Sequence, residues 1–222
     1  ITCRDWSSDV CSSDLRLLDP PLHEFVPTRQ DERSKLAQSL GITADELNKR
    51  ADGLHESNPM MGHRGVRLGV TSPEITEMQV RAILESTVEL VKEGKKIHPE
   101  IMVPVVGMKN ELVDQKLLVY KVYADTLANY GVKKIDYLYG TMIEIPRAAL
   151  TAGRIAETAE FFSFGTNDLT QMSFGFSRDD IGGFVPDYVE KKILPADPFQ
   201  ILAQEGVGEM TATGIQRGRA TR

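Results

Sequence analysis

The stretch from Phe161 to Gln171, FFSFGTNDLTQ, decides the fold that we expect for this chain. It begins with an aromatic and apolar run, breaks at Gly165, and then presents Thr166, Asn167 and Asp168. This pattern predicts a buried strand, at 161–164, whose C-terminal end opens into a loop with an amide and a carboxylate. In α/β proteins, ligands bind at the C-terminal ends of the strands. The sequence therefore predicts a ligand site at this loop.

A second carboxylate, Glu144, ends another apolar run, YGTMIEIP. A carboxylate that is buried without a partner is unfavourable, so Glu144 must be protonated, paired with a cation or bound to a metal. Two carboxylates at two strand ends suit Mg²⁺, which retains water ligands and accepts substrate oxygens. Glu144 and Asp168 are therefore the predicted metal ligands, and a salt bridge is the alternative for Glu144.

Strands and helices alternate along the rest of the chain, which predicts parallel βαβ units. Besides the run before Gly165, strands are expected at 16–19, 101–106 and 138–144, with one more near 66–70. A closed eight-stranded barrel typically needs about 250 residues. The prediction is therefore an α/β fold, a partial (β/α)8 TIM-type barrel that lacks its first strand and its last two.

Helices are expected between and after these strands. A small helical insertion is predicted at about 30–55, where Thr43 and Glu46 have the spacing of a capping box. Gly153 and Arg154 should weaken their helix by about 1 kcal/mol. The remaining segments are predicted as helices at 73–94, 111–129, 146–160 and from 199 onward, with a loop from about 171 to 195.

The first 15 residues differ in character from the rest. They contain both cysteines, Cys3 and Cys11, and the only tryptophan, Trp6, and they show no helical or strand period. The run DWSSDVCSSDL also resembles a translated sequencing adapter. Residues 1–15 are therefore expected to be a non-native, adapter-derived leader outside the fold, with a disordered native leader as the alternative.

Composition and charge exclude several classes of function. The net charge of −6 argues against nucleic acid as the main partner, because phosphate contacts need a basic face. No apolar run approaches the roughly 20 residues that span a bilayer, and no secretory signal is recognisable. A cytoplasmic protein without a membrane or nucleic-acid partner is expected.

Three arginines are candidates for binding an anion. Arg64 lies between two glycines, which let a ligand approach a guanidinium that can hold phosphate in a bidentate manner. Arg81 is expected on a helix, and Arg178 is followed by two aspartates, so ordinary ion pairs are the alternatives for both. The residues alone indicate a Mg²⁺-dependent α/β-barrel enzyme that acts on a small anion.

Several segments resemble the C-terminal barrel of the pyruvate, phosphate dikinase family, over roughly residues 16–222. They are RLLDPPLHEFVP, ESNPMMGHRGVRLGV, IEIPRAALTA, AEFFSFGTNDLTQMSFGFSRDD and DPFQILAQEGVGEM. The GTNDLTQ and GHRG segments are also similar to phosphoenolpyruvate synthase and to enzyme I of the sugar-phosphotransferase system. The two-helix insertion and ESNPMMGHRG favour the dikinase family.

The resemblance implies a domain that binds pyruvate and phosphoenolpyruvate, with Mg²⁺ as the cofactor. It implies phosphoryl transfer between pyruvate and a phosphohistidine on a separate domain of the full-length chain, and a homodimer. The overall reaction would convert ATP, phosphate and pyruvate into AMP, diphosphate and phosphoenolpyruvate. By motif, the resemblance implies catalytic roles for Arg64 and Asn167, Mg²⁺ ligation by Glu144 and Asp168, and substrate binding by Arg64, Arg81, Glu144, Gly165, Thr166, Asn167, Asp168 and Arg178.

The chain also departs from the family pattern. A further phosphate-binding arginine would precede residue 16, a proton-donating cysteine would follow residue 222, and the other domains are missing. We therefore expect a partial gene product that catalyses no net reaction alone. The alternatives are the equivalent domain of phosphoenolpyruvate synthase or enzyme I, a Mg²⁺-dependent aldolase or lyase barrel, and a non-catalytic dimerisation fragment.

Overall fold

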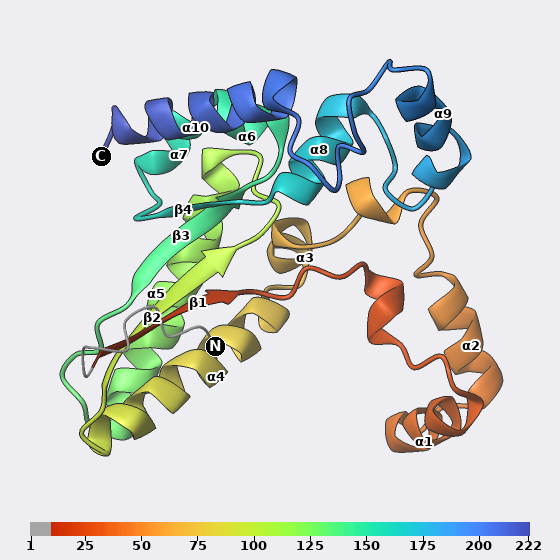
Figure 1. Cartoon of the computed structure of the whole chain (residues 1–222). Helices are drawn as coiled ribbons and strands as arrows, with labels where there is room; N and C mark the ends of the chain where they lie inside the picture. Colours follow the sequence, from red (N-terminus) through yellow and green to blue (C-terminus); the bar gives the residue numbers. More distant parts are fainter. Residues whose placement is uncertain (1–9) are drawn as a thin grey trace.

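One parallel sheet organises the computed structural model, which describes residues 10–222 (Figure 1). All three strand pairs in this range are parallel, so the C-terminal ends of the strands meet at one edge of the sheet. The sheet curls into half a barrel, which confirms the predicted α/β class, whereas the eight-stranded topology stays a prediction. In chain order the strands are β1 Val10–Arg16, β2 Lys96–Val103, β3 Leu138–Ile143 and β4 Phe162–Phe164.

Helices cover the sheet and extend it at one end. α4 and α5 lie side by side along the sheet, and α10 lies against α6 and α7 (Figure 1). The helix predicted at 73–94 is confirmed as α4; at the helical spacing of its apolar residues, Val80, Leu84 and Val88 are fully buried, whereas Val91, near the end of the helix, is 39% exposed. The helices are α1 Gln30–Leu40, α2 Ala44–Asp52, α3 Val66–Thr71, α4 Pro73–Lys92, α5 Lys109–Tyr130, α6 Pro146–Leu150, α7 Ala152–Ala156, α8 Thr166–Phe174, α9 Val185–Glu190 and α10 Glu209–Arg219, with short turns at η1 Leu22–Phe25, η2 Pro59–Met61, η3 Ile181–Gly183 and η4 Gln204–Gly208.

The first strand does not lie where the sequence predicted it. β1 ends at Arg16 instead of beginning there, and it pairs along its length with the first seven residues of β2. Leu17 continues the ladder by one hydrogen bond to the carbonyl of Met102, 2.9 Å away, before Pro20 ends it. The exclusion of residues 10–15 from the fold was therefore wrong, because backbone pairing depends little on side-chain pattern. Residues 1–9 lie outside the described range, and the origin of the leader stays a prediction.

The extra strand predicted near 66–70 is a helix, α3. The amide of Gly69 donates to the carbonyl of Gly65 at 3.1 Å, which closes a helical turn. A Cβ on Gly69 would lie 2.5 Å from Oε1 of Gln115, so the glycine lets α3 approach α5 closely. The apolar run was misread because a short buried helix and a short buried strand have the same composition.

The single helix predicted at 146–160 is two helices, α6 and α7. They are separated at Thr151, whose φ of −112° and ψ of 18° are not helical. A Cβ on Gly153 would lie 3.3 Å from the carbonyl oxygen of Arg217 and 3.2 Å from Oγ1 of Thr221. Gly153 therefore allows α10 to pack closely against α7. The sequence analysis considered only the effect of this glycine on helix propensity and did not predict this packing role.

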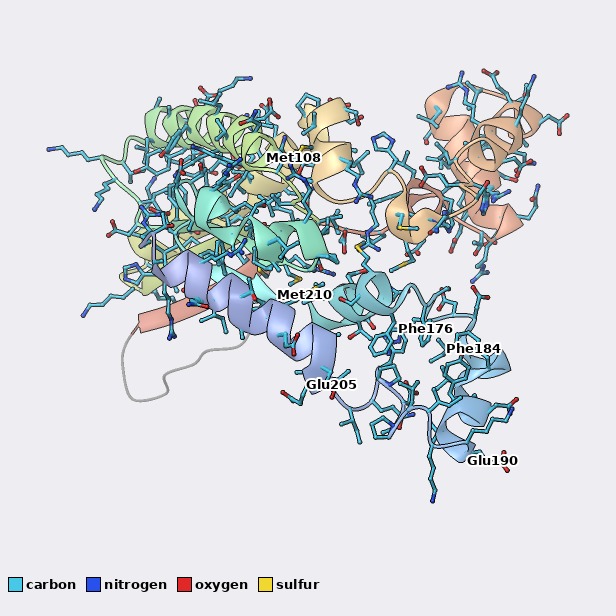
Figure 2. The ribbon with its side chains drawn as sticks, turned by 90° about the horizontal axis from the view of Figure 1, so that it is seen from above. Met108, Phe176, Phe184, Glu190, Glu205 and Met210 are labelled. Atoms are coloured by element: carbon cyan, nitrogen blue, oxygen red, sulfur yellow. The ribbon has the colours of Figure 1, made fainter. Side chains whose placement is uncertain are left out.

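The segment predicted as loop from 171 to 195 contains the last turn of α8 and the whole of α9. α8 begins directly after the glycine of the GTND motif, and α9 follows after the short turn η3. Phe176, Phe184 and Tyr188 stabilise this part of the chain, with ring centroids 4.9 to 6.3 Å apart, and Figure 2 shows the two phenylalanines side by side. The helix predicted from 199 begins only at Glu209.

The predicted helical insertion is confirmed as the pair α1 and α2. Oγ1 of Thr43 accepts a hydrogen bond from the amide of Glu46 at 3.2 Å, as the capping signal predicted. The two helices pack on each other and project away from the sheet (Figure 1). The insertion therefore leaves the C-terminal edge of the strands accessible to other segments.

Candidate functional site

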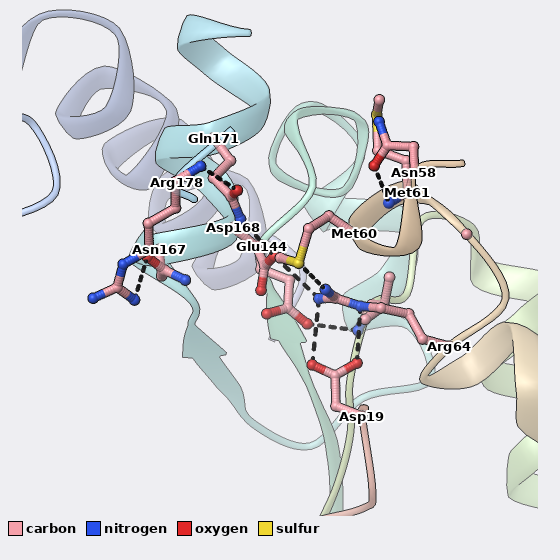
Figure 3. Close-up of polar contacts among 12 residues, drawn as sticks. Asp19, Asn58, Met60, Met61, Arg64, Glu144, Asn167, Asp168, Gln171 and Arg178 are labelled. Atoms are coloured by element: carbon pink, nitrogen blue, oxygen red, sulfur yellow. Dashed lines mark hydrogen bonds and ion pairs between the residues drawn. The ribbon is translucent and has the colours of Figure 1, made fainter. Parts of the chain in front are cut away.

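Three carboxylates converge at the C-terminal edge of the sheet. Asp19 follows β1, Glu144 follows β3 directly, and Asp168 lies in the first turn of α8, just after β4. Each offers an oxygen, and these oxygens lie within 4.8 Å of one another (Figure 3). The three residues are only 8%, 1% and 7% exposed. The parallel sheet thus brings together residues that are about 150 positions apart in the chain.

Glu144 is held by an unusual backbone conformation. Its Oε1 accepts a hydrogen bond from the amide of Val105 at 2.6 Å. Val105 has a φ of 61°, in the left-handed region that a β-branched residue rarely adopts. Such a conformation costs on the order of 1–3 kcal/mol and occurs mostly at functional sites. The turn after β2 therefore directs a backbone donor at the Glu144 carboxylate.

The other oxygen of Glu144 faces the GTND segment. A Cβ on Gly165 would lie 2.4 Å from Oε2 of Glu144 and 2.7 Å from its Cβ. Only glycine leaves room for this approach, although its φ of −84° is open to any residue. The glycine of the motif is therefore required by space, and it brings the start of α8 against Glu144.

Burial raises the pKa of Glu144 to about 8. Loss of hydration is the largest cause, the Val105 hydrogen bond opposes it, and the negative charges of Asp168 and Asp19 raise the pKa further. Burial also raises the pKa of Asp19, against the opposing effect of the Arg64 charge. In both residues burial is the main cause of the raised pKa, and the charge of a neighbouring carboxylate adds to it.

Arg64 is the buried cation of the cluster. Its side chain is 4% exposed, and its Nη2 lies 3.0 Å from Oδ1 of Asp168. Its Nε lies 3.2 Å from Oδ1 of Asp19, and its Nη2 donates to Oδ2 of Asp19 at 3.3 Å. The Nε contact is an ion pair and not a hydrogen bond, because Nε of Arg64 and Oδ1 of Asp19 are buried and, among the described residues, have no partner in hydrogen-bond geometry. Arg64 therefore joins two strand ends electrostatically.

Two further contacts complete the surroundings of Arg64. Among residues 10–222, the acceptor recorded for its Nη1 is the sulfur of Met60, at 3.3 Å. Arg16, at the end of β1, places its Nη1 3.2 Å from Oδ2 of Asp19, and its side chain is half exposed. Thioether sulfur is a weak acceptor, so one end of the Arg64 guanidinium keeps donors for a stronger ligand.

Asn167 and Arg178 form a second polar pair at the start of α8. Nη1 of Arg178 donates to Oδ1 of Asn167 at 3.0 Å, and its backbone amide donates to Oε1 of Gln171 at 2.9 Å. Figure 3 shows this pair beside Asp168. The structure therefore joins Arg178 to the GTND segment by a side-chain contact.

Arg81 lies in a different environment from the other predicted residues. On α4, its Nη2 binds Oε1 of Glu77 at 2.7 Å, and Glu77 also faces Lys121 of α5 at 3.5 Å. Among the described residues, its recorded ion pair is thus on the helix surface and not with the carboxylate cluster. The role of Arg81 in the site stays a prediction without a contact that supports it.

Sequence reasoning missed Asp19, Arg16, Met60 and Val105. Asp19 could have been found, because it ends the apolar run RLLD as Glu144 ends its own run. Arg16, in the same run, would have followed from it. Val105 could not be recognised from the sequence, because it contributes a backbone amide in a conformation that valine does not favour.

The cluster fits a divalent cation. Carboxylate oxygens are the preferred ligands of Mg²⁺, and three buried carboxylates face one buried guanidinium. Glu144 and Asp168 are the residues that would hold the ion, because the recorded contacts with Val105 and Arg64 engage one oxygen of each, Oε1 of Glu144 and Oδ1 of Asp168. Asp19 is engaged by arginines on both oxygens.

The comparisons with known proteins identify the family of this chain. The family described as "PEP-utilising enzyme, PEP-binding domain" matches residues 12–222. This chain belongs to that family. PEP is phosphoenolpyruvate, and the match covers all three carboxylates and Arg64. The predicted family membership is therefore confirmed.

Relatives from distant organisms carry one name. Pyruvate, phosphate dikinase of Clostridium symbiosum is 54% identical over 209 residues, which are 94% of this chain and 24% of the relative. The proteins of that name from Rhizobium meliloti and Giardia intestinalis are 53% and 50% identical, over 94% of this chain and 23% of each relative. The chain spans about a quarter of the length of these relatives.

One further finding bears on the surroundings of the protein. Within residues 10–222, none of the helices combines the length and the apolar character that crossing a bilayer requires.

Proposed function

We propose that this chain is the pyruvate-side domain of a pyruvate, phosphate dikinase. It would transfer a phosphoryl group between pyruvate and a phosphohistidine on a separate domain, with ATP and phosphate consumed in the overall reaction. The observation that carries the proposal is the buried cluster of carboxylates around Arg64, in a chain of the PEP-binding family. A cytoplasmic homodimer is part of the same proposal.

Glu144 and Asp168 would hold Mg²⁺ in this site. When bound, the ion polarises the enolate oxygen of pyruvate and makes its methyl proton easier to remove. The residues fit this role because their oxygens are close, buried and unbalanced in charge. Val105 would keep Glu144 oriented through its 2.6 Å hydrogen bond, so that Oε2 stays directed toward the GTND segment.

Arg64 would bind the phosphoryl group. Phosphoryl transfer depends on alignment and charge neutralisation more than on covalent work by the protein. Arg64 is already fixed between Asp19 and Asp168, and within the described part of the chain the partner of its Nη1 is a sulfur atom. The guanidinium could therefore exchange that weak contact for a phosphate oxygen with little reorganisation.

The first turn of α8 would bind the substrate from the other side. Gly165 precedes the helix without any side-chain cap, so the amides of Thr166 and Asn167 have no partner within the helix. These amides and the positive end of the helix favour an anion. Asn167 would act together with Arg178, whose Nη1 already contacts it, and Arg178 would neutralise the phosphate being transferred.

Two alternative functions are distinguished from the proposal by simple measurements. The equivalent domain of phosphoenolpyruvate synthase or enzyme I would use a different partner, so dependence of the complete enzyme on inorganic phosphate distinguishes the dikinase. A non-catalytic dimerisation module would bind neither substrate nor metal. We expect that the 222-residue chain binds substrate but catalyses no net reaction alone.

Calorimetry with phosphoenolpyruvate, or with oxalate as a mimic of the pyruvate enolate, tests the proposal. Binding heat is expected in the presence of Mg²⁺, and removal of Mg²⁺ or the change Asp168→Ala should abolish it. Asp31→Asn is a matched control, because Asp31 forms only an exposed pair with Arg29. Equal heat with and without Mg²⁺, or unchanged heat in Asp168→Ala, would contradict the proposal.

A further inference from the structure

Asp19 is the one carboxylate of the cluster that is surrounded by arginines. Its Oδ1 lies 3.2 Å from Nε of Arg64, and its Oδ2 lies 3.3 Å from Nη2 of Arg64 and 3.2 Å from Nη1 of Arg16. The two contacts with Arg64 run side by side along one edge of the guanidinium. The Nη2 contact is a charge-assisted hydrogen bond and the Nε contact is an ion pair, so the carboxylate restrains the guanidinium at two points.

Asp19 also has little freedom to move. The residue is 8% exposed, and a Cβ on Gly65, the neighbour of Arg64, would lie 3.0 Å from Oδ1 of Asp19. Gly65 has a φ of 54°, so the backbone next to Arg64 turns sharply at this point of contact. The loop that carries Arg64 is therefore built against the Asp19 carboxylate.

The other two carboxylates are placed differently. Glu144 has one oxygen on the Val105 amide, and within residues 10–222 no ion pair to an arginine is recorded for it. Asp168 contacts Arg64 through Oδ1. A divalent cation would meet two positive side chains at Asp19, whereas it would meet none at Glu144, and like charges at these distances repel.

We infer that Asp19 is a positioning residue, which holds Arg64 for the phosphoryl group and is not a third metal ligand. The inference rests on the proposed function and adds a residue to it. Nε and Nη2 of Arg64 are turned to the carboxylates, which leaves Nη1, beside the Met60 sulfur, as the donor for the anion. Without Asp19 the long side chain is fixed at a single point, so its orientation toward the substrate is lost.

Two titrations of the 222-residue chain test the inference. Phosphoenolpyruvate affinity is measured by calorimetry at saturating Mg²⁺, and Mn²⁺ affinity without substrate is measured by electron paramagnetic resonance. In Asp19→Asn, phosphoenolpyruvate affinity should fall about tenfold or more, because a charge-assisted contact is lost. Mn²⁺ affinity should change by less than about threefold. Asp31→Asn should change neither.

A double-mutant cycle then shows whether Asp19 acts through Arg64. Adding Asp19→Asn to Arg64→Met should lower phosphoenolpyruvate affinity no further than Arg64→Met does alone. The double variant also removes both buried charges together, so it should fold even where Asp19→Asn alone leaves Arg64 poorly paired and unstable. In that case, equal Mn²⁺ affinities of Arg64→Met and the double variant support the inference.

Three results would overturn it. Mn²⁺ affinity in Asp19→Asn could fall as far as in Glu144→Gln, which would make Asp19 a ligand. The losses of phosphoenolpyruvate affinity could multiply in the double variant, or Asp19→Asn could leave that affinity unchanged. Failure of the unsubstituted chain to bind phosphoenolpyruvate is a separate result, which overturns the proposed function itself.

Discussion

Glu144 concentrates the chemistry of the site in one residue. The residue is 1% exposed, its carboxylate accepts one short hydrogen bond, and the charges of two further carboxylates raise its pKa. Such a group is stable at neutral pH only when it is protonated or bound to a cation. The pKa of about 8 and the proposed metal role are therefore two consequences of the same burial.

The stability of the metal-free chain should depend on the protonation of Glu144. The folded-state pKa of about 8 lies above the usual 4.5, so the folded state retains a proton that the unfolded state releases. The stabilising effect is complete below pH 4.5 and is lost as the pH rises toward 8, by on the order of 1 kcal/mol per pH unit.

Urea unfolding in the presence of a chelator measures this effect at several pH values. The difference in unfolding free energy between the unsubstituted chain and Glu144→Gln isolates the one group from all others that titrate. This difference should decrease from pH 5 to pH 8. A difference that is independent of pH would contradict a raised pKa of the buried Glu144 carboxyl group.

Gly165→Ala should damage the site through space alone. The new Cβ would lie 2.4 Å from Oε2 of Glu144, so the carboxylate must move. Overpacking of this kind costs about 1–3 kcal/mol, and displacement of a metal ligand lowers metal affinity about 10- to 100-fold. Mn²⁺ binding and thermal unfolding measure the two effects.

Gly182→Ala is the matched control for this change. Gly182 has open space around its Cβ position, so neither stability nor Mn²⁺ affinity should change. If Gly165→Ala retained full Mn²⁺ affinity, the close approach of the GTND segment to Glu144 would be wrong.

At the level of elements, the sequence predicted regular patterns well and local exceptions poorly. The stripe of α4 at Val80, Leu84 and Val88 is fully buried, as its helical spacing indicated. By contrast, α8 begins immediately after Gly165, where the polar residues suggested a loop. Thr166, Asn167 and Asp168 form the first turn of α8, and polarity alone does not distinguish a loop from the first turn of a helix.

The site was predictable to the extent that it follows strand ends. Glu144 and Asp168 were found because each follows an apolar run, and the sheet does bring them together. Arg81 was predicted by motif, yet its ion pair is with Glu77. Val105 could not be found, because its amide acts through a backbone conformation that tertiary contacts impose.

Thr43→Ala tests whether the helical insertion is independent of the proposed metal site. The change removes the hydrogen bond from the Glu46 amide to Oγ1 of Thr43, which should destabilise α2 by about 1 kcal/mol. Because α1 and α2 project away from the sheet, affinity for Mn²⁺ should not change. Circular dichroism and Mn²⁺ titration measure the two effects, with exposed Lys49→Ala as the control; a loss of metal affinity would contradict this separation.

The whole molecule connects its fold to its site. The segments that follow β1 and β3 and the first turn of α8 each carry one carboxylate of the cluster, and a bound ion would link the last two of these segments through Glu144 and Asp168. A ligand that binds only the folded state stabilises it by about 2.7 kcal/mol at 100 times its dissociation constant. Mg²⁺ should therefore raise the thermal unfolding midpoint of the chain.

The same measurement has an internal control. Glu144→Gln and Asp168→Asn should unfold at midpoints that Mg²⁺ does not change, whereas Asp31→Asn should respond as the unsubstituted chain does. An equal response in all four proteins would mean that the ion stabilises the chain through another part of its surface.

The central claim is that Glu144 and Asp168 hold one divalent ion, to which phosphoenolpyruvate binds. Electron paramagnetic resonance of Mn²⁺ tests it directly, because free and bound ions are distinguishable and the spectrum responds to new ligands. The account predicts one bound ion per chain, a changed spectrum when phosphoenolpyruvate is added, and loss of binding in Glu144→Gln and in Asp168→Asn. No bound ion in the unsubstituted chain, or full binding in both variants, would contradict it.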